Sequence, residues 1–377
     1  MRKQFIYFLL VPLFFILQQS LFSQTYQFLG QASGWMSYAT KNIHFGVRYI
    51  PEFSITQPLQ DDIIGDVNIA LNTFSTSLFS EHRTPLYTGR VKPYRVLGRL
   101  SSDKFEARLG LQKINFGSAT LLRPLMWFDA IDPRDPLQLT DGVYAFLARS
   151  YFSDNSNLWL WGLFGNNELK GMDIVPSQKN SFEFGGRFQT PLWNGEIAAT
   201  YHHRTADMNR ILSSPKVSDE DRYALDGKWD IDIGVWFEAV LVHRSTSVTS
   251  LQFQRLWTVG ADYTFSVGNG LNVLTEYFRS ENSSSILGSA NGSGFSALSV
   301  NYPLSIVDRV SGMVYRDWAS LQWYRLVSLQ RTYDNWIMYL LGYWNPSTNQ
   351  RIQHPTGEAG RITYSGTGMQ LMIVFNH

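Results

Sequence analysis

Apolar and polar residues alternate along this chain in runs of about ten residues, and turn-forming residues separate the runs. In the run Phe105-Glu-Ala-Arg-Leu-Gly-Leu-Gln112, apolar side chains occupy every second position. Successive side chains of a β-strand point to opposite faces, so each run predicts a strand with one apolar and one polar face. The same pattern recurs at 182–189 and 257–266. Such strands suit either a two-sheet sandwich or a barrel whose apolar face meets lipid.

The lengths of the connections favour the barrel. Short gaps such as 101–103 and 191–193 nearly alternate with long gaps such as 74–90, 117–141 and 205–220. Membrane barrels have short turns at the periplasmic end and long loops at the outer end. The sequence therefore predicts one all-β, antiparallel transmembrane β-barrel of eighteen strands, with sixteen as the alternative count. We expect the strands near 26–38, 43–55, 63–73, 91–100, 104–116, 142–152, 157–165, 181–190, 194–204, 221–229, 233–245, 253–266, 270–280, 294–302, 309–317, 320–330, 335–345 and 366–376.

The first residues predict a cleaved export signal. Arg2 and Lys3 precede an apolar run from Phe5 to Leu17, and Ser23 offers a small residue for cleavage. This three-part order is typical of a secretory signal peptide. The apolar run is shorter than the ~20 residues that a membrane-spanning helix needs. We therefore expect residues 1–23 to be a signal peptide and residues 24–377 to form a barrel in the outer membrane of a Gram-negative bacterium.

Composition excludes several other classes of protein. The 32 Lys and Arg residues nearly balance 31 Asp and Glu, so the chain lacks the basic excess of a nucleic-acid binder. With no Cys it can form neither a disulfide scaffold nor a thiolate metal site. Charged residues make up 17%, below the ~25% of a typical soluble domain. Many Trp and Tyr residues fall near the ends of expected strands, where the two membrane surfaces would lie, although a large aromatic core is the alternative.

One region resembles a known family. It begins with Leu-Gly-Leu-Gln-Lys-Ile-Asn-Phe-Gly at 109–117 and continues with Asp132-Pro133 and Asp135-Pro136. A strand that carries Gln, ends in an aromatic residue and Gly, and is followed by a loop with Asp-Pro pairs resembles the porin-like and alginate-export-like outer-membrane barrels. The resemblance implies an outer-membrane channel or a relative of one. Phe116 stands where that family pattern has Trp, and the basic ladder of an anionic-polymer channel is thin, so no substrate is implied.

The long segment 117–141 is the best candidate for a functional site. Prolines at 124, 133 and 136 stiffen it. A loop of this kind that folds inward would narrow the pore, and charges at a constriction set ion selectivity. The alternative is an ordinary surface loop whose charges pair with one another. The candidate constriction residues are Arg123, Asp129, Asp132, Arg134, Asp135 and Asp141.

A second set of charged residues lies in the polar phase of the expected strands. A barrel of this size encloses more space than side chains fill unaided. These residues therefore either line water or cross-link a plugged interior, and their mixed signs predict weak ion selectivity. The candidate lumen-lining residues are Glu106, Arg108, Glu183, Arg187, Glu238, Arg244 and Glu276.

No motif indicates catalysis or a bound metal. His202 and His203 are adjacent on an expected strand, so their side chains point to opposite faces and cannot chelate one ion together. We expect them to be surface residues at a strand end. The sequence has no zinc-protease, nucleophile-elbow or phosphate-loop motif. We therefore predict no enzyme, no cofactor and no metal.

These observations predict a porin-like outer-membrane channel through which small hydrophilic solutes diffuse passively. The alternative is a closed barrel that acts as a structural or assembly component of an outer-membrane surface or secretion complex. The expected partners are outer-membrane lipid and a small hydrophilic solute. A homo-oligomer or a surface-complex partner is a further expectation, and nucleic acid is not expected.

Overall fold

A computed structural model of the chain describes residues 24–39, 42–60, 62–80, 84–209, 211, 217–347 and 364–377. The expected signal peptide, residues 1–23, lies outside the described residues. The described part contains one short 3-10 helix, η1 (Thr249–Leu251), and no helix long and apolar enough to cross a membrane. The strands are β1 (Thr25–Ala39), β2 (Asn42–Gln60), β3 (Ile63–Ser80), β4 (Leu86–Ser102), β5 (Phe105–Gln112), β6 (Val143–Tyr151), β7 (Asn157–Phe164), β8 (Phe182–Leu192), β9 (Gly195–Asp207), β10 (Val217–Ile231), β11 (Ile233–Arg244), β12 (Phe253–Phe265), β13 (Leu271–Ser283), β14 (Ala290–Pro303), β15 (Asp308–Asp317), β16 (Trp323–Thr332), β17 (Trp336–Trp344) and β18 (Thr367–Asn376).

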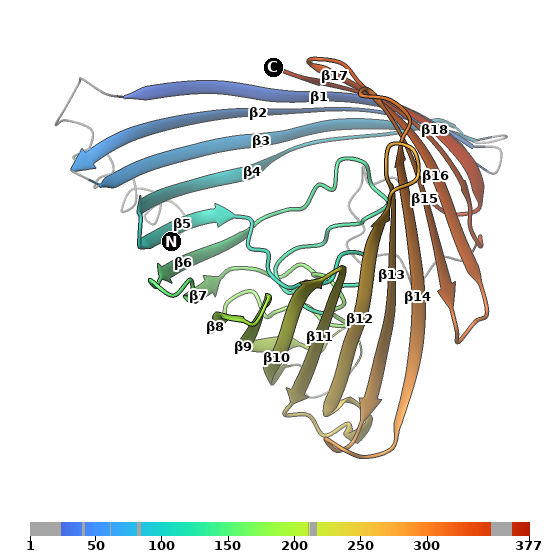
Figure 1. Cartoon of the computed structure of the whole chain (residues 1–377). Coiled ribbons are helices and arrows are strands. Elements are labelled where there is room, and N and C mark those ends of the chain that lie inside the picture. The colour runs from blue at the N-terminus through green and yellow to red at the C-terminus, as the bar shows by residue number, and fades with distance from the viewer. Residues whose placement is uncertain are drawn as a thin grey trace.

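The sheet closes on itself to form a barrel (Figure 1). Each strand pairs antiparallel with its neighbours in sequence, and β1 also pairs with β18. The register of this last pair runs from Gln31 opposite Asn376 to Ala39 opposite Gly368. Closure leaves no strand edge unpaired, which is what a sheet in lipid requires. The predicted fold, a single antiparallel barrel of eighteen strands, is confirmed, and the alternative count of sixteen is excluded.

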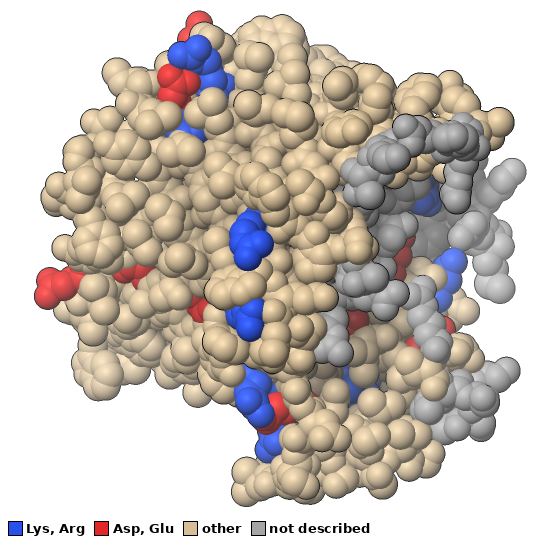
Figure 2. Space-filling model, turned by 90° about the vertical axis from the view of Figure 1, so that its right-hand side faces the viewer, with Lys and Arg blue, Asp and Glu red and all other residues tan. Residues whose placement is uncertain are grey.

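The outer face of the wall is apolar along most strands. On β17, Met338 and Leu340 point outward and are exposed, while Leu341 and Tyr343 point inward and are buried. Figure 2 shows one side of the barrel as a mostly uncharged surface on which Lys, Arg, Asp and Glu are sparse. A continuous apolar band of this kind is typical of a barrel that faces lipid.

Several strands are longer than the sequence indicated. β3 and β4 pair up to Leu78 opposite Leu86, inside the gap expected at 74–90. β9 and β10 pair up to Asp207 opposite Val217, inside the gap expected at 205–220. Polar residues such as Ser75 and Thr76 interrupt the apolar pattern there, but the backbone hydrogen bonds of the ladder continue past the apolar band. The loop assignment of these residues was therefore wrong.

Some tryptophan rings on the inner wall lie over glycines of the next strand. A Cβ atom at Gly260 would approach Nε1 of Trp236 to 2.3 Å, and one at Gly46 would approach Trp35 to 2.0 Å. Only glycine allows a ring to lie this close to the backbone of its neighbour. At Gly260 this arrangement brings the Trp236 N–H to Glu276, where it donates a 2.9 Å hydrogen bond.

Candidate functional site

The chain between β5 and β6, residues 113–142, enters the barrel and lies against the inner wall (Figure 1). Ile114 and Leu125 of this inner loop are each 1% exposed. Leu122 and Leu125 share an apolar cluster with wall residues that include Val240 and Leu256. An apolar loop needs such a wall to be buried, so the loop and the wall form one packed unit.

Two wall carboxylates hold the inner loop in place. Glu238 of β11 accepts hydrogen bonds from the backbone N–H groups of Ala119 (2.8 Å) and Leu125 (3.0 Å). Glu276 of β13 accepts three more, from Thr120 (2.6 Å), Leu121 (2.9 Å) and Leu122 (2.6 Å). These carboxylates are almost fully buried, at 0% and 2% exposure. Each replaces water as the acceptor for amides that the loop could not otherwise satisfy.

A glycine in the inner loop makes this contact geometrically feasible. Gly117 has a φ of +101°, and a Cβ at this position would lie 2.3 Å from Oε1 of Glu238. A residue with a side chain would therefore be strained in backbone conformation and would collide with the carboxylate.

The charged residues of the inner loop pair mainly within the loop and with the nearby wall. Arg123 bonds Asp129 (3.4 Å), Arg134 bonds Asp132 (2.7 Å), and Asp141 bonds Lys92 of β4 (2.6 Å). Asp135 accepts the N–H of Leu137 (3.0 Å). The loop thus combines features of the two alternatives, since it lies inside the barrel and its charges are paired.

A second segment, residues 165–181 between β7 and β8, packs beside the inner loop. The N–H of Gly171 donates to the carbonyl of Asp129 (2.9 Å), which joins the two segments. Asp173 bonds both Arg204 of β9 (3.0 Å) and Arg222 of β10 (2.7 Å). The second segment is therefore anchored to the wall by charge, whereas the inner loop is held through its backbone amides.

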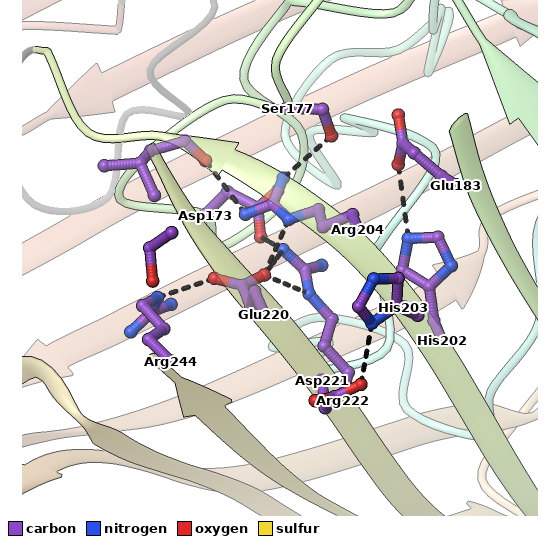
Figure 3. A network of polar contacts seen from close by, with 12 residues as sticks. Asp173, Ser177, Glu183, His202, His203, Arg204, Glu220, Asp221, Arg222 and Arg244 are labelled. Atoms are coloured by element: carbon purple, nitrogen blue, oxygen red, sulfur yellow. Dashed lines mark hydrogen bonds and ion pairs between the residues drawn. The ribbon is translucent and has the colours of Figure 1, made fainter. Parts of the chain in front are cut away.

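Three arginines surround one carboxylate beneath this segment (Figure 3). Glu220 bonds Arg204 (2.6 Å), Arg222 (2.7 Å) and Arg244 (2.6 Å). All four side chains are at most 3% exposed. This cluster, with Asp173, carries more positive than negative groups in a buried site. Of this cluster only Arg244 was a sequence candidate. Glu220 lies just before the expected strand 221–229, whereas Arg204 and Arg222 lie within expected strands but were not singled out.

The adjacent histidines point to opposite sides of the wall, as predicted, but one of them is not on the surface (Figure 3). His202 is 1% exposed and lies between Trp161 and Glu183, each 3.2 Å away. His203 is partly exposed on the outer face and contacts Asp221 at 2.9 Å. The expected surface position of His202 was wrong because the strand continues beyond it and Trp127 and Phe128 of the inner loop pack against its ring. Among the described residues, no group of three His, Asp or Glu side chains could hold a metal ion.

The seven candidate lumen-lining residues all lie on the inner face, but they differ in burial and in the partners that they bond. Arg187 forms a buried double contact with Asp226 (2.6 and 2.8 Å). Glu183, Glu238, Arg244 and Glu276 are also buried in networks with the loops or the wall. Only Glu106 and Arg108 keep partly accessible side chains, at 11% and 22%, and they bond each other at 2.8 Å.

The inner face of β2 to β6 keeps partly accessible charged side chains and is predominantly basic. Arg99 of β4 bonds Asp66 (2.8 Å) and has a side chain that is 39% exposed, and Arg95 donates to the carbonyl of Thr140 in the inner loop (3.1 Å). The pairing registers place seven basic residues on this inner face against three acidic ones, Glu52, Asp66 and Glu106. The basic residues are Arg48, Arg90, Lys92, Arg95, Arg99, Arg108 and Arg149.

Sequence periodicity missed most of this basic wall for a structural reason. The register of β3 and β4 shifts between Ala70 and Leu71, where β4 carries one extra residue. Arg90 and Lys92 precede the bulge and Arg95 and Arg99 follow it, so they fall in opposite phases of a strict two-residue repeat. A Pro within an expected strand, here Pro93, is the signal that could have revealed the bulge.

Comparison with known proteins identifies the fold. No protein-family model matches the sequence, and no curated protein sequence matches it. Solved structures do match. OccD3 (OpdP) of Pseudomonas aeruginosa is similar with a TM-score of 0.60 and 11% identity, over 93% of this chain and 91% of that one. OccAB1 of Acinetobacter baumannii has a TM-score of 0.56 and 7% identity, over 94% of this chain and 95% of that one.

A third similar structure is the anion-selective porin from Comamonas acidovorans, with a TM-score of 0.50 and 11% identity, over 94% of this chain and 100% of that one. The structural neighbours are thus outer-membrane porins with closed barrels. At these identities the likeness establishes the fold of this chain alone.

Proposed function

We propose that this protein is an outer-membrane channel that admits small hydrophilic solutes by passive diffusion and favours anions. The observation that carries the proposal is the division of charge inside the barrel. Glu220 on β10, Glu238 on β11 and Glu276 on β13 are buried as partners of arginines or loop amides. Basic groups on β2 to β6 remain partly accessible.

The division matters because only accessible charge acts on a passing solute. Glu238 and Glu276 face the inner loop, and their exposure of 0% and 2% removes them from contact with water. Arg99, at 39%, and Arg108, at 22%, face the part of the interior that water reaches. Charged side chains lining a constriction set the sign of the ion that passes. The accessible arginines on the inner face therefore support a preference for anions, in place of the weak selectivity expected from the sequence.

The inner loop is the proposed constriction. Its residues 119–125 pack against β11 to β13, so the proposed route for a solute runs between this part of the loop and the basic wall. Lys92 and Asp141, 2.6 Å apart, join the loop to this wall and form one border of the route. Arg123, Asp129, Asp132, Arg134 and Asp135 act in this proposal mainly by keeping the loop rigid, since they are bonded within it.

The test is the reversal potential of the refolded protein in a planar bilayer across a gradient of potassium chloride. We expect a sign that reports chloride preference. The double variant Arg90→Gln, Arg99→Gln should reduce this preference, since it removes two accessible charges from the inner wall. Arg331→Gln is the matched control, because Arg331 pairs with Asp308 on the outer face, away from the lumen. Potassium preference in the unmodified protein would overturn the proposal, as would an unchanged reversal potential in the double variant.

We also propose that residues 1–23 are a cleaved signal peptide for export. The protein then resides in the outer membrane of a Gram-negative bacterium and contacts its lipid. OmpT of Vibrio cholerae, a similar structure with a TM-score of 0.51, is described in a trimer form, and this supports testing for a homo-oligomer here. Four expectations stay predictions from the sequence. They are the alternative of a closed structural barrel, a partner in a surface complex, the likeness to alginate-export-like barrels and the absence of enzyme activity.

A further inference from the structure

We propose that the outer face of β15 and β16 carries a binding site for a phosphorylated glycolipid headgroup, formed by Arg316 and Arg325 on either side of Trp323. The proposal rests on the outer-membrane location given above. It concerns the surface that faces lipid, and it adds a lipid partner of defined chemistry to the channel.

The three side chains share the outward face of two adjacent strands. Arg316 stands opposite Trp323 in the register, and Arg325 follows two residues later on β16. The guanidinium carbon of Arg316 lies 4.9 Å from the centre of the Trp323 ring, and that of Arg325 lies 5.9 Å from it. Two cations therefore contact one indole, an arrangement that holds both guanidinium groups in defined positions.

Arg316 is also positioned by the turn that follows β15. Its guanidinium group donates a hydrogen bond to the carbonyl of Leu321, a residue with a φ of +58°. It also lies 5.7 Å from the ring of Trp318. A long side chain restrained at three points loses less entropy when it binds a ligand than a free one does.

These two arginines differ from other outward-facing cations of the barrel. Arg331 pairs with Asp308 (2.8 Å) and Arg279 with Glu281 (2.6 Å). No carboxylate of the described residues forms an ion pair with Arg316 or Arg325. Two neighbouring cations on an apolar surface repel each other, and an anion placed between them removes that cost.

The site lies at the level where lipid phosphates occur. It adjoins the end of the barrel that carries the long connections, including those after β5, β7 and β17, and this end faces outward in barrels of the class. Trp318, Trp323 and Trp344 are exposed at the same end, as expected for the aromatic belt at a membrane surface. Arginine binds phosphate through paired N–H groups, whereas the apolar flank provided by the indoles suits the acyl chains below the headgroup.

Native mass spectrometry of the refolded full chain tests the site. The probes are diphosphorylated lipid A, the same lipid without phosphate, and inorganic phosphate. We expect the protein to retain diphosphorylated lipid A and to bind the dephosphorylated lipid far more weakly. The variant Arg316→Gln, Arg325→Gln should weaken retention by about tenfold or more, since each arginine contributes charge-assisted hydrogen bonds. Arg331→Gln is the matched control and should bind as the unmodified protein does.

Three results would overturn the inference: equal binding of the dephosphorylated lipid, unchanged retention in the double variant, or displacement of the lipid by an equal concentration of inorganic phosphate. If the double variant does not fold, as judged by heat-dependent migration in gels, Arg316→Lys, Arg325→Lys replaces it. That variant keeps the charge but not the paired geometry, and we expect intermediate retention. Channel conductance should be unaffected by either variant, so failure of the lipid site and failure of the channel are distinguishable.

Discussion

Glu276 is buried in the barrel wall, yet its two carboxylate oxygens accept four hydrogen bonds. Three come from consecutive backbone amides of the inner loop, and one comes from Trp236. A buried carboxylate without such donors would be strongly destabilising. At the scale of single residues, buried acidic side chains on the inner wall therefore act as hydrogen-bond acceptors that hold the inner loop. The position of the loop in turn limits the space left for a lumen.

Replacing Glu276 by Gln tests this role. A glutamine offers one acceptor oxygen, and its NH2 group would face loop amides that also donate. Each charge-assisted bond lost contributes roughly 1.5–3 kcal/mol, so we expect the inner loop to detach from the wall. Bilayer recordings should show larger and noisier conductance than in the unmodified protein. Asp219→Asn, at an exposed outward-facing position on β10, is the control, and equal behaviour of the two variants would argue against this role of Glu276.

Glu220 provides a second prediction at this scale. It is the shared counter-charge of Arg204, Arg222 and Arg244, so Glu220→Gln leaves three buried arginines short of one negative charge. Removing one partner of a buried ion pair costs roughly 3–5 kcal/mol. The midpoint of thermal unfolding, followed by circular dichroism in detergent, should fall clearly. Asp308→Asn, which breaks an exposed pair, should change it little, and an unchanged midpoint for Glu220→Gln would rule out a stabilising cluster.

At the scale of elements, strands were predictable from sequence and the interior loops were only partly so. Alternation marks strands because each residue faces either lipid or the interior, and all eighteen expected ranges overlap an observed strand. The inner loop was marked by its length and prolines. Its partners Glu238 and Glu276 were recognised as inward-facing, but the contact could not be foreseen, since more than a hundred residues separate them from Ala119 and Thr120. The bulge in β4 concealed the basic wall.

Shortening the inner loop tests its role as an element. Replacing residues 119–136 by a short Gly-Ser linker removes the segment that packs against β11 to β13, and the paired backbone of the barrel itself remains. We expect a larger single-channel conductance and a weaker preference for small solutes over large ones. Removal of residues 285–288 from the exposed connection between β13 and β14 is the control. If both deletions have the same effect, the inner loop is not the constriction.

At the scale of the whole molecule, the outward apolar band and the closure of β1 on β18 define a barrel that lipid can surround. This level was predicted almost completely, because periodicity and connection lengths are properties of the entire chain. The division of the interior into buried loop anchors and accessible basic residues was not predicted. Both kinds of residue occupy inward-facing positions of the strands, so their sequence pattern is the same.

The lipid-facing assignment yields its own prediction. Leu340 lies at the middle of β17 and points outward, so Leu340→Arg places a cation near the centre of the bilayer. Such substitutions cost roughly 2–4 kcal/mol at the midplane and much less near the interfaces. Thr367→Arg, outward-facing at the end of β18, is the matched control. Urea titration of the protein folded in lipid vesicles should show a large loss for Leu340→Arg only, and equal losses would argue against this orientation in the membrane.

In the proposed channel, water and small solutes pass between the inner loop and the basic wall. Single-channel recording of the purified, refolded protein in a planar bilayer tests it most directly. We expect discrete conductance steps whose size increases with salt concentration. A barrel that is folded by heat-dependent migration and inserts into the bilayer, but conducts nothing, would contradict it.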